Sequence, residues 1–146
     1  MSKIYAFIII VPFIALLLFK GILFYEYDTK QRYIKDLSDN TAYVVKITGV
    51  LTTEVYSELK VKLNKFARFE DANIVLMKGV YDNGTLTNMT AYILGTQLNK
   101  GDAFLIYIKS ADVSNYSKLQ NGGVDSDATQ NLYYCAKAQC RVEYVP

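Results

Sequence analysis

The stretch IYAFIIIVPFIALLLF, Ile4–Phe19, decides how this chain must be organised. It carries no charge, and after Lys20 the apolar character resumes as far as Tyr25. A helix over this region would be about 33 Å long at about 1.5 Å per residue, which matches the hydrocarbon core of a bilayer. Lys20 lies near one end, where its ammonium group can reach the interface. The sequence therefore predicts a membrane-spanning helix over residues 1–25.

A cleaved secretory signal is the alternative interpretation of the same stretch, with Met1–Lys3 as its charged start. The apolar run is longer than the usual core of a signal, and no small-x-small cleavage site follows it. The chain instead leaves the run as Phe19-Lys20-Gly21-Ile22. We therefore expect a retained anchor.

The charged segment after the span is expected to continue the same helix. Residues 26–48 contain neither glycine nor proline. Side chains recur at spacings of three and four as one stripe of a helix, namely Ile34, Leu37, Thr41, Val44, Thr48 and Leu51. The stretch TAYVVKIT (41–48) is rich in β-branched residues, which leaves a strand open as the alternative. The spacing runs straight through it and favours helix.

A second helix is predicted after a break at Gly49. That glycine suits the position just beyond a helix end, and Thr52 or Thr53 suits the N-cap of the next helix. The following residues place four apolar side chains on one helical face: Val55, Leu59, Leu63 and Phe66. Residues 26–66 are thus predicted to be a helical stalk and a second helix.

From residue 67 to residue 146 the pattern changes to short β-branched and aromatic runs, which is typical of strands. Asn83-Gly84 predicts a tight hairpin turn, because both residues tolerate positive φ, and Asn99–Asp102 is a second turn candidate. The expected fold is α+β, with an antiparallel sheet of about four strands that has one face closed by the second helix. Ser114–Asn131 is expected to be a polar connection. The four runs are ANIVLMKGVY (72–81), TNMTAYILG (87–95), AFLIYIKSA (103–111) and LYYCAKAQCRVEYV (132–145).

Composition argues against most enzymes and against nucleic-acid binding. The net charge is +2, from 16 basic and 14 acidic residues, so no dense basic face for a phosphate backbone is expected. The chain has no histidine, the commonest general base and metal ligand. No nucleophile–base pair or phosphate-binding glycine loop is suggested by spacing. We expect no catalytic residues and no cofactor.

Cys135 and Cys140 flank the four residues AKAQ. This spacing is neither a metal signature nor the C-x-x-C of a redox enzyme. In an exported domain it predicts a disulfide that closes a hairpin, because oxidising compartments retain such bonds. Two independent reduced thiols in a strand are the alternative.

Two weaker patterns concern modification and calcium. Asp125, Asp127, Thr129 and Asn131 place oxygen ligands at alternate positions, as at the start of a calcium loop, but the glycine and closing glutamate of such a loop are absent. A solvated loop is the better interpretation, and we expect no metal. Three acceptor sequons would be surface positions in a host that glycosylates exported proteins. They begin at Asn83, Asn88 and Asn115.

This layout, with the local stretch KITGVLT (46–52), resembles the pilin-like architecture, and more narrowly the TadE-like pseudopilins and the small single-span proteins of Gram-positive conjugative elements. The resemblance implies a filament whose core is built from the apolar N-terminal helices, with copies of the chain, the membrane and an assembly machinery as partners. Processed pilins keep a glutamate early in the apolar helix, and Ile4–Phe19 has none. The residues expected to carry assembly are Ile8, Pro12, Leu16 and Phe19.

Two other functions stay open, and the orientation is contested. The chain could be a non-polymerising, membrane-tethered accessory protein of a secretion or conjugation complex, or an anchored ligand-binding domain. Positive charge is heavier after the span (Lys20, Lys30, Arg32, Lys35) than before it (Lys3), which favours a cytoplasmic sheet domain. The cysteine pair and the pilin-like layout favour an extracytoplasmic one, at the cell surface or in the filament. We expect the sheet domain to be extracytoplasmic.

Overall fold

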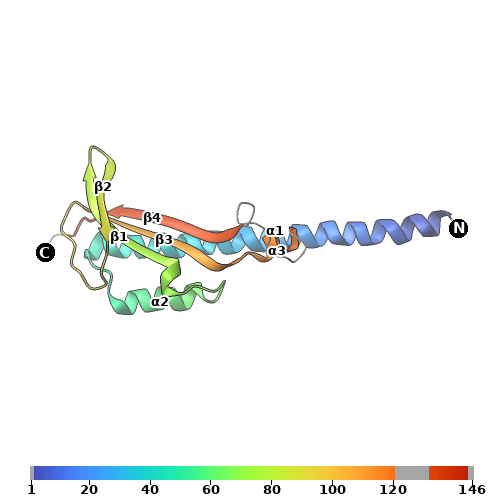
Figure 1. The fold of residues 1–146 in the computed structure, drawn as a ribbon, viewed down its shortest axis with the longest axis horizontal. Helices are drawn as coiled ribbons and strands as arrows, with labels where there is room; N and C mark the ends of the chain where they lie inside the picture. The colour runs from blue at the N-terminus through green and yellow to red at the C-terminus, as the bar shows by residue number, and fades with distance from the viewer. Residues whose placement is uncertain (1, 121–131, 145–146) are drawn as a thin grey trace.

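One helix runs through nearly the whole length of the molecule (Figure 1). The computed structural model describes residues 2–120 and 132–144. Helix α1, Ser2–Thr48, is 47 residues long and includes Pro12, which corresponds to about 70 Å. The predicted continuation of the span into the stalk is confirmed. The strand alternative for residues 41–48 is wrong, because the helix ends only at Thr48.

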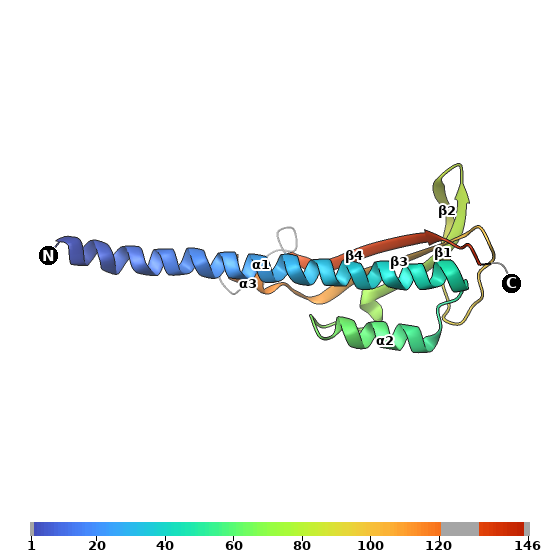
Figure 2. The same cartoon turned by 180° about the vertical axis from the view of Figure 1, so that it is seen from behind.

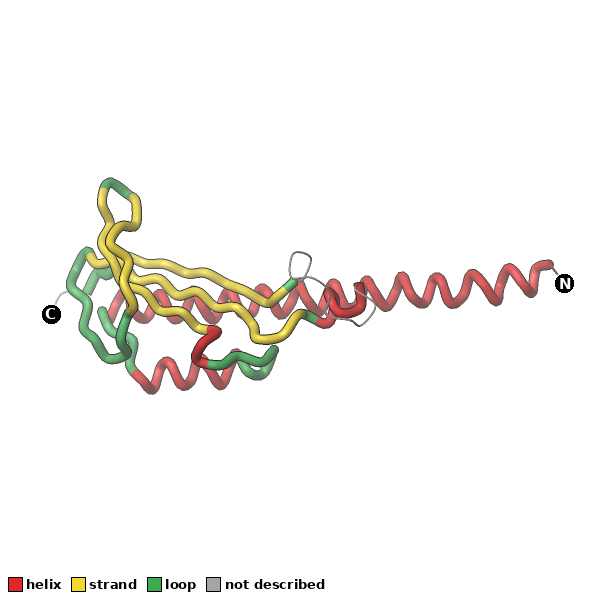
Figure 3. The backbone as a smooth tube through the Cα atoms, viewed as in Figure 1, coloured by secondary structure: helices red, strands yellow, loops and turns green. Residues whose placement is uncertain are grey.

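Four strands form one antiparallel sheet with the order β2-β1-β3-β4 (Figure 3). The hairpin between β1 and β2 turns at Asn83 and Gly84, with φ of 48° and 82°, as two positive φ values in a tight turn require. The predicted α+β layout and the hairpin turn are both confirmed. The strands are β1 (Ile74–Asp82), β2 (Thr85–Ala91), β3 (Asp102–Val113) and β4 (Tyr133–Arg141).

The core lies between one face of the sheet and two helices, namely the second half of α1 and α2, Thr53–Leu63 (Figure 2). We expected α2 alone to close this face, and that expectation is wrong, because α1 lies along β4 and β3. The buried stripe of α1 is also rotated from the predicted one. Small side chains at two of its positions allow the helix to approach the sheet closely. The stripe consists of Ile34, Ser38, Thr41, Ala42 and Val45.

The connection between the helices follows the predicted chemistry. Gly49 has φ of 72°, and its N–H donates to the carbonyl of Val45 (2.7 Å), as a residue just beyond a helix end does. The Thr52 hydroxyl accepts from the N–H of Val55 and caps α2. Helix α2 ends at Leu63, so Phe66 lies beyond it rather than in its last turn.

Two short elements were not expected. A 3-10 turn, η1 (Asp71–Asn73), precedes β1, and helix α3 (Asn115–Gln120) occupies the start of the segment predicted as a polar connection. Ser114, just before α3, and Ser117, within it, are fully buried. The Ser117 hydroxyl accepts from the N–H of Leu132 (3.0 Å) and so ties α3 to the start of β4. Figure 1 shows α3 lying against α1 where the helix leaves the sheet domain.

Candidate functional site

The first half of α1 projects from the sheet domain and is exposed along its whole length (Figure 2). Every residue from Ser2 to Ile22 is exposed. This segment is long and apolar enough to cross a membrane, by length and composition. Pro12 is exposed, as are the other three predicted assembly residues. Ile8, Leu16 and Phe19 retain 59%, 49% and 52% of their accessible surface.

Such a surface does not remain in water. Burying one large apolar side chain gains about 1.5–3 kcal/mol, so covering the whole segment gains on the order of tens of kcal/mol. That gain exceeds the total folding free energy of an ordinary domain. A helix that is apolar all round is covered by lipid or by other apolar helices. The segment is therefore the strongest candidate interaction surface of the chain.

The apolar segment meets the sheet domain at an aromatic junction. The rings of Phe24 and Tyr116 lie edge to face with centroids 5.4 Å apart, and Tyr27 stacks on Tyr134 at 5.5 Å. The side-chain amide of Asn115 donates to the Glu26 carboxylate (3.3 Å). This junction links α1, α3 and β4 at the level where the apolar run ends.

From Glu26 onwards charged side chains become frequent, and several are paired along the helix. Glu26 lies 2.8 Å from the Nζ of Lys30, and the hydrogen bond from Lys30 lowers the pKa of Glu26. Arg32 pairs with Asp28 in the same i, i+4 arrangement (2.8 Å). The helix surface thus changes within about one turn from a segment whose charged side chains are Lys3 and Lys20 to one that carries a series of charged pairs.

Beyond the junction, side chains of α1 bind the outer edge of β4. Tyr27 Oη donates to the carbonyl of Tyr133 (3.4 Å), and Lys35 Nζ donates to the carbonyl of Lys137 (2.7 Å). Gln31 lies between them and bonds the backbone of Cys135. The contacting residues are four apart in α1 and two apart in β4. Four helical residues advance about 6.0 Å and two strand residues about 6.6 Å, so the contacts can repeat in step along both elements. The helix thereby satisfies an edge strand that would otherwise be open.

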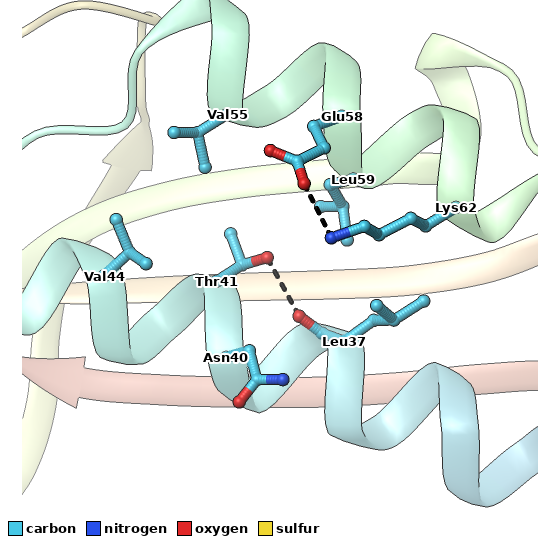
Figure 4. Close-up of a pocket in the computed structure, with 8 residues that line it drawn as sticks. All are labelled: Leu37, Asn40, Thr41, Val44, Val55, Glu58, Leu59 and Lys62. Carbon is cyan, nitrogen blue, oxygen red and sulfur yellow. Dashed lines mark hydrogen bonds and ion pairs between the residues drawn. The ribbon is translucent and has the colours of Figure 1, made fainter.

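A shallow groove of about 220 Å³ lies between α1 and α2 (Figure 4). Its walls are formed by side chains from both helices, and Glu58 and Lys62 form an ion pair (2.7 Å) within α2. The hydrogen bond from Lys62 lowers the pKa of Glu58. Apolar side chains of both helices lie beside this charged pair (Figure 4). The groove is lined by Leu37, Asn40, Thr41, Val44, Val55, Glu58, Leu59 and Lys62.

The prediction of a disulfide between Cys135 and Cys140 is wrong, because both cysteines are free. Both lie in the single strand β4, and an odd separation places their side chains on opposite faces. Five strand residues span about 16 Å, whereas a disulfide needs Cα atoms about 4.4–6.8 Å apart. Cys140 is buried, and burial raises its pKa to about 11. The alternative of two independent thiols is correct.

The remaining candidate residues are not brought together. Asn83, Asn88 and Asn115 are all exposed and lie at the hairpin turn, within β2 and at the start of α3. The calcium candidates Asp125, Asp127, Thr129 and Asn131 lie outside the described residues. Within residues 2–120 and 132–144, no group of three or more potential metal-ligating side chains occurs.

Two residues with a clear structural role were missed from the sequence. Gln31 and Tyr116 join α1 to the sheet domain. The spacing of Tyr27, Gln31 and Lys35 at intervals of four was a usable signal for a shared helix face. The chain matches no protein-family model, no curated protein and no solved structure.

Proposed function

We propose that this protein is a structural subunit of an extracellular filament or pseudopilus that assembles through its apolar N-terminal helix. One observation carries the proposal. The same helix α1 is exposed and apolar from Ser2 to Ile22 and is packed against the sheet domain in its second half. Copies that bury the first half against one another would leave their sheet domains on the outside.

The physical basis is the gain from covering the apolar segment. Lipid covers it while the subunit waits in the membrane, and neighbouring helices cover it in a filament. Ile8, Pro12, Leu16 and Phe19 follow one another at i, i+4, i+8 and i+11, so they form one helix face for such contacts. The layout resemblance to pilin-like proteins supports the same arrangement.

We place the sheet domain outside the cytoplasm, as this architecture implies. The cysteines no longer support that location, because they do not form a disulfide. The basic residues after the span still favour the opposite side. Lys30, Arg32 and Lys35 each form an ion pair with an acidic residue four positions away. Acidic residues count for little in the positive-inside rule, so these pairs weaken the conflict without removing it.

The accessory-protein function remains the second candidate, because Ile4–Phe19 offers no charged group that would set the register between copies. A segment of this kind suits lipid as well as it suits other helices. In that case the protein would remain a single-span anchor that presents its sheet domain to a partner.

Crosslinking in cells distinguishes the two functions. A photoreactive amino acid at Ile8 should give a ladder of homomultimers, and the same group at Tyr107, on the sheet, serves as the control.

Leu16→Asp should abolish the ladder, because a charge at the bilayer centre costs about 2.5–3.5 kcal/mol, whereas Leu16→Met should keep it. Membrane fractionation separates failure of insertion from failure of assembly. A membrane-inserted protein that gives neither ladder nor filament would refute the filament and favour the accessory function.

A further inference from the structure

We infer that α3 and the adjoining turn of α1 form a second membrane contact, which rests on the headgroup and glycerol region of the bilayer. The inference rests on the membrane anchoring in the proposed function and deepens it. We call this surface the aromatic collar. It consists of Phe24, Tyr25, Tyr27 and Tyr116.

The position of the collar along α1 carries the first part of the argument. Residues from Ser2 to Ile22 are free of the sheet domain, and Phe24 is in contact with Tyr116 of α3. The apolar run ends at Tyr25, and the first carboxylate, Glu26, bonds Asn115 of α3. The residues of α1 that contact α3, Phe24 and Glu26, lie within one turn of Tyr25, the end of the run. If the run fills the hydrocarbon core, α3 must therefore lie at the bilayer surface.

The chemistry of the collar carries the second part. Tyrosine combines an apolar ring with a polar hydroxyl, and such side chains gather at membrane–water interfaces. Phe24 and Tyr25 retain 54% and 72% of their accessible surface. More than half of each side chain is therefore not packed against the sheet domain. Lys20 precedes the collar and Lys118 lies in α3, and both are exposed. Their ammonium groups suit lipid phosphates.

The contact would hold the sheet domain at a defined depth. A single spanning helix can slide and tilt in a bilayer, because mismatch costs only a fraction of a kcal/mol per ångström. A second contact on α3, fixed to α1 through Phe24, Tyr27 and Glu26, restricts both motions. The collar would therefore keep all anchored subunits at the same height.

The chain has no tryptophan, so a single tryptophan reports from one known place. We would compare three full-length variants in phosphatidylcholine vesicles whose acyl chains carry bromine quenchers either near the glycerol or near the chain ends. Tyr116→Trp tests the collar, Leu16→Trp tests insertion of the span, and Tyr81→Trp, beside the hairpin turn, is the control. Equal unfolding midpoints of variants and wild type show that each variant folds.

The inference predicts that Tyr116→Trp loses more emission to the shallow bromines than to the deep ones, that Leu16→Trp shows the reverse, and that Tyr81→Trp is unaffected. If Leu16→Trp is quenched and Tyr116→Trp is not, anchoring stands and the collar is refuted. If Leu16→Trp is unquenched, the anchoring itself fails and the collar with it. In the Tyr116→Trp variant, the introduced indole could instead become buried only at high protein-to-lipid ratio. That result would show that a second copy covers the surface, and it would also overturn the inference.

A measurement on the unmodified protein removes any dependence on the substitution. In nanodiscs that contain lipids with a nitroxide near the headgroup, the backbone amide signals of α3 should broaden, while those of the hairpin Asp82–Thr85 should not. Equal broadening in both places, or in neither, would contradict the inference.

Discussion

The side-chain amide of Gln31 pairs with the backbone of Cys135 as a neighbouring strand would. The N–H of Cys135 donates to Gln31 Oε1 (3.1 Å), and Gln31 Nε2 donates to the carbonyl of Cys135. Both groups lie on the outer edge of β4, the last strand of the sheet. One helical side chain therefore completes both backbone bonds of an edge residue, and it also fixes where α1 lies along the sheet.

Replacing Gln31 should test how firmly this contact holds the helix to the sheet. Gln31→Ala leaves both backbone groups of Cys135 without their partner, so the free energy of unfolding should fall by about 1–3 kcal/mol. Arg32→Ala is the matched control, because it removes only an exposed ion pair with Asp28 and should cost about 0.3–0.5 kcal/mol. Urea unfolding of the full chain in detergent measures both. Equal losses would mean that the edge contact contributes nothing specific.

Gly49 should tolerate substitution less well than Gly84, although φ is positive at both. A Cβ at Gly49 would clash with the side chain of Gln97 and lie 3.1 Å from the carbonyl of Leu98, whereas one at Gly84 meets nothing within 4 Å. Gly84→Ala should cost about 1–2 kcal/mol, for the left-handed backbone alone. Gly49→Ala should cost about 1–3 kcal/mol more, because of the clash. Thermal unfolding followed by circular dichroism would show the difference, and a reversed order would contradict the geometry at Gly49.

The two cysteines should remain as separate thiols even in an oxidising compartment. Protein denatured without reductant should react with two equivalents of a thiol reagent, since Cys135 and Cys140 are both free and lie on opposite faces of β4. In the folded protein the Cys140 thiol should react more slowly than that of Cys135, because it is buried and its pKa is raised to about 11. Mass spectrometry of the alkylated peptides separates the two sites. Denatured protein without any reactive thiol would be evidence for the disulfide.

The hydrogen bond between Tyr56 and Asp71 should give the stability an alkaline limit. Tyr56 Oη donates to Asp71 Oδ1 (3.0 Å), and burial followed by this hydrogen bond raises the pKa of Tyr56 from its ordinary value near 10 to about 12. The folded state therefore favours the neutral phenol. The contribution of this phenol to the free energy of unfolding is complete below pH 10 and is lost as the pH rises to 12. Tyr56→Phe should cost about 1 kcal/mol at pH 8. That difference from wild type should shrink between pH 10 and pH 12, and a constant difference would assign the effect to packing.

Local chemistry made most of the secondary structure predictable. The uninterrupted run before Gly49, the Thr52 cap and the Asn83-Gly84 turn each depend on neighbouring residues, and each occurs as expected. Helix α3 escaped prediction because it is only six residues long and mostly polar in sequence, and because Ser114 and Ser117 are buried although serine is usually exposed. Its position is set by contacts with α1 rather than by its own periodicity.

Long-range pairing explains the remaining failures. The rotation of the buried stripe from Leu37 and Val44 to Ser38 and Ala42 follows from which face of α1 the sheet occupies, and periodicity alone does not determine that choice. The cysteine spacing predicted a hairpin, but the stretch between the cysteines continues β4 as it pairs with β3. A local sequence pattern does not determine which distant strands pair.

The continuity of α1 makes the sheet domain a lever arm. The helix has no break between the apolar segment and Thr48, so an inclination of the segment, within the range that the collar allows, moves the far end of the domain. About 34 Å of helix follows the apolar run, and at the tilt of about 20° that is common for single spans its end moves sideways by about 12 Å. Small rotations at the membrane thus become large displacements of the β1–β2 hairpin, and partners that meet this end would sense the inclination of the anchor.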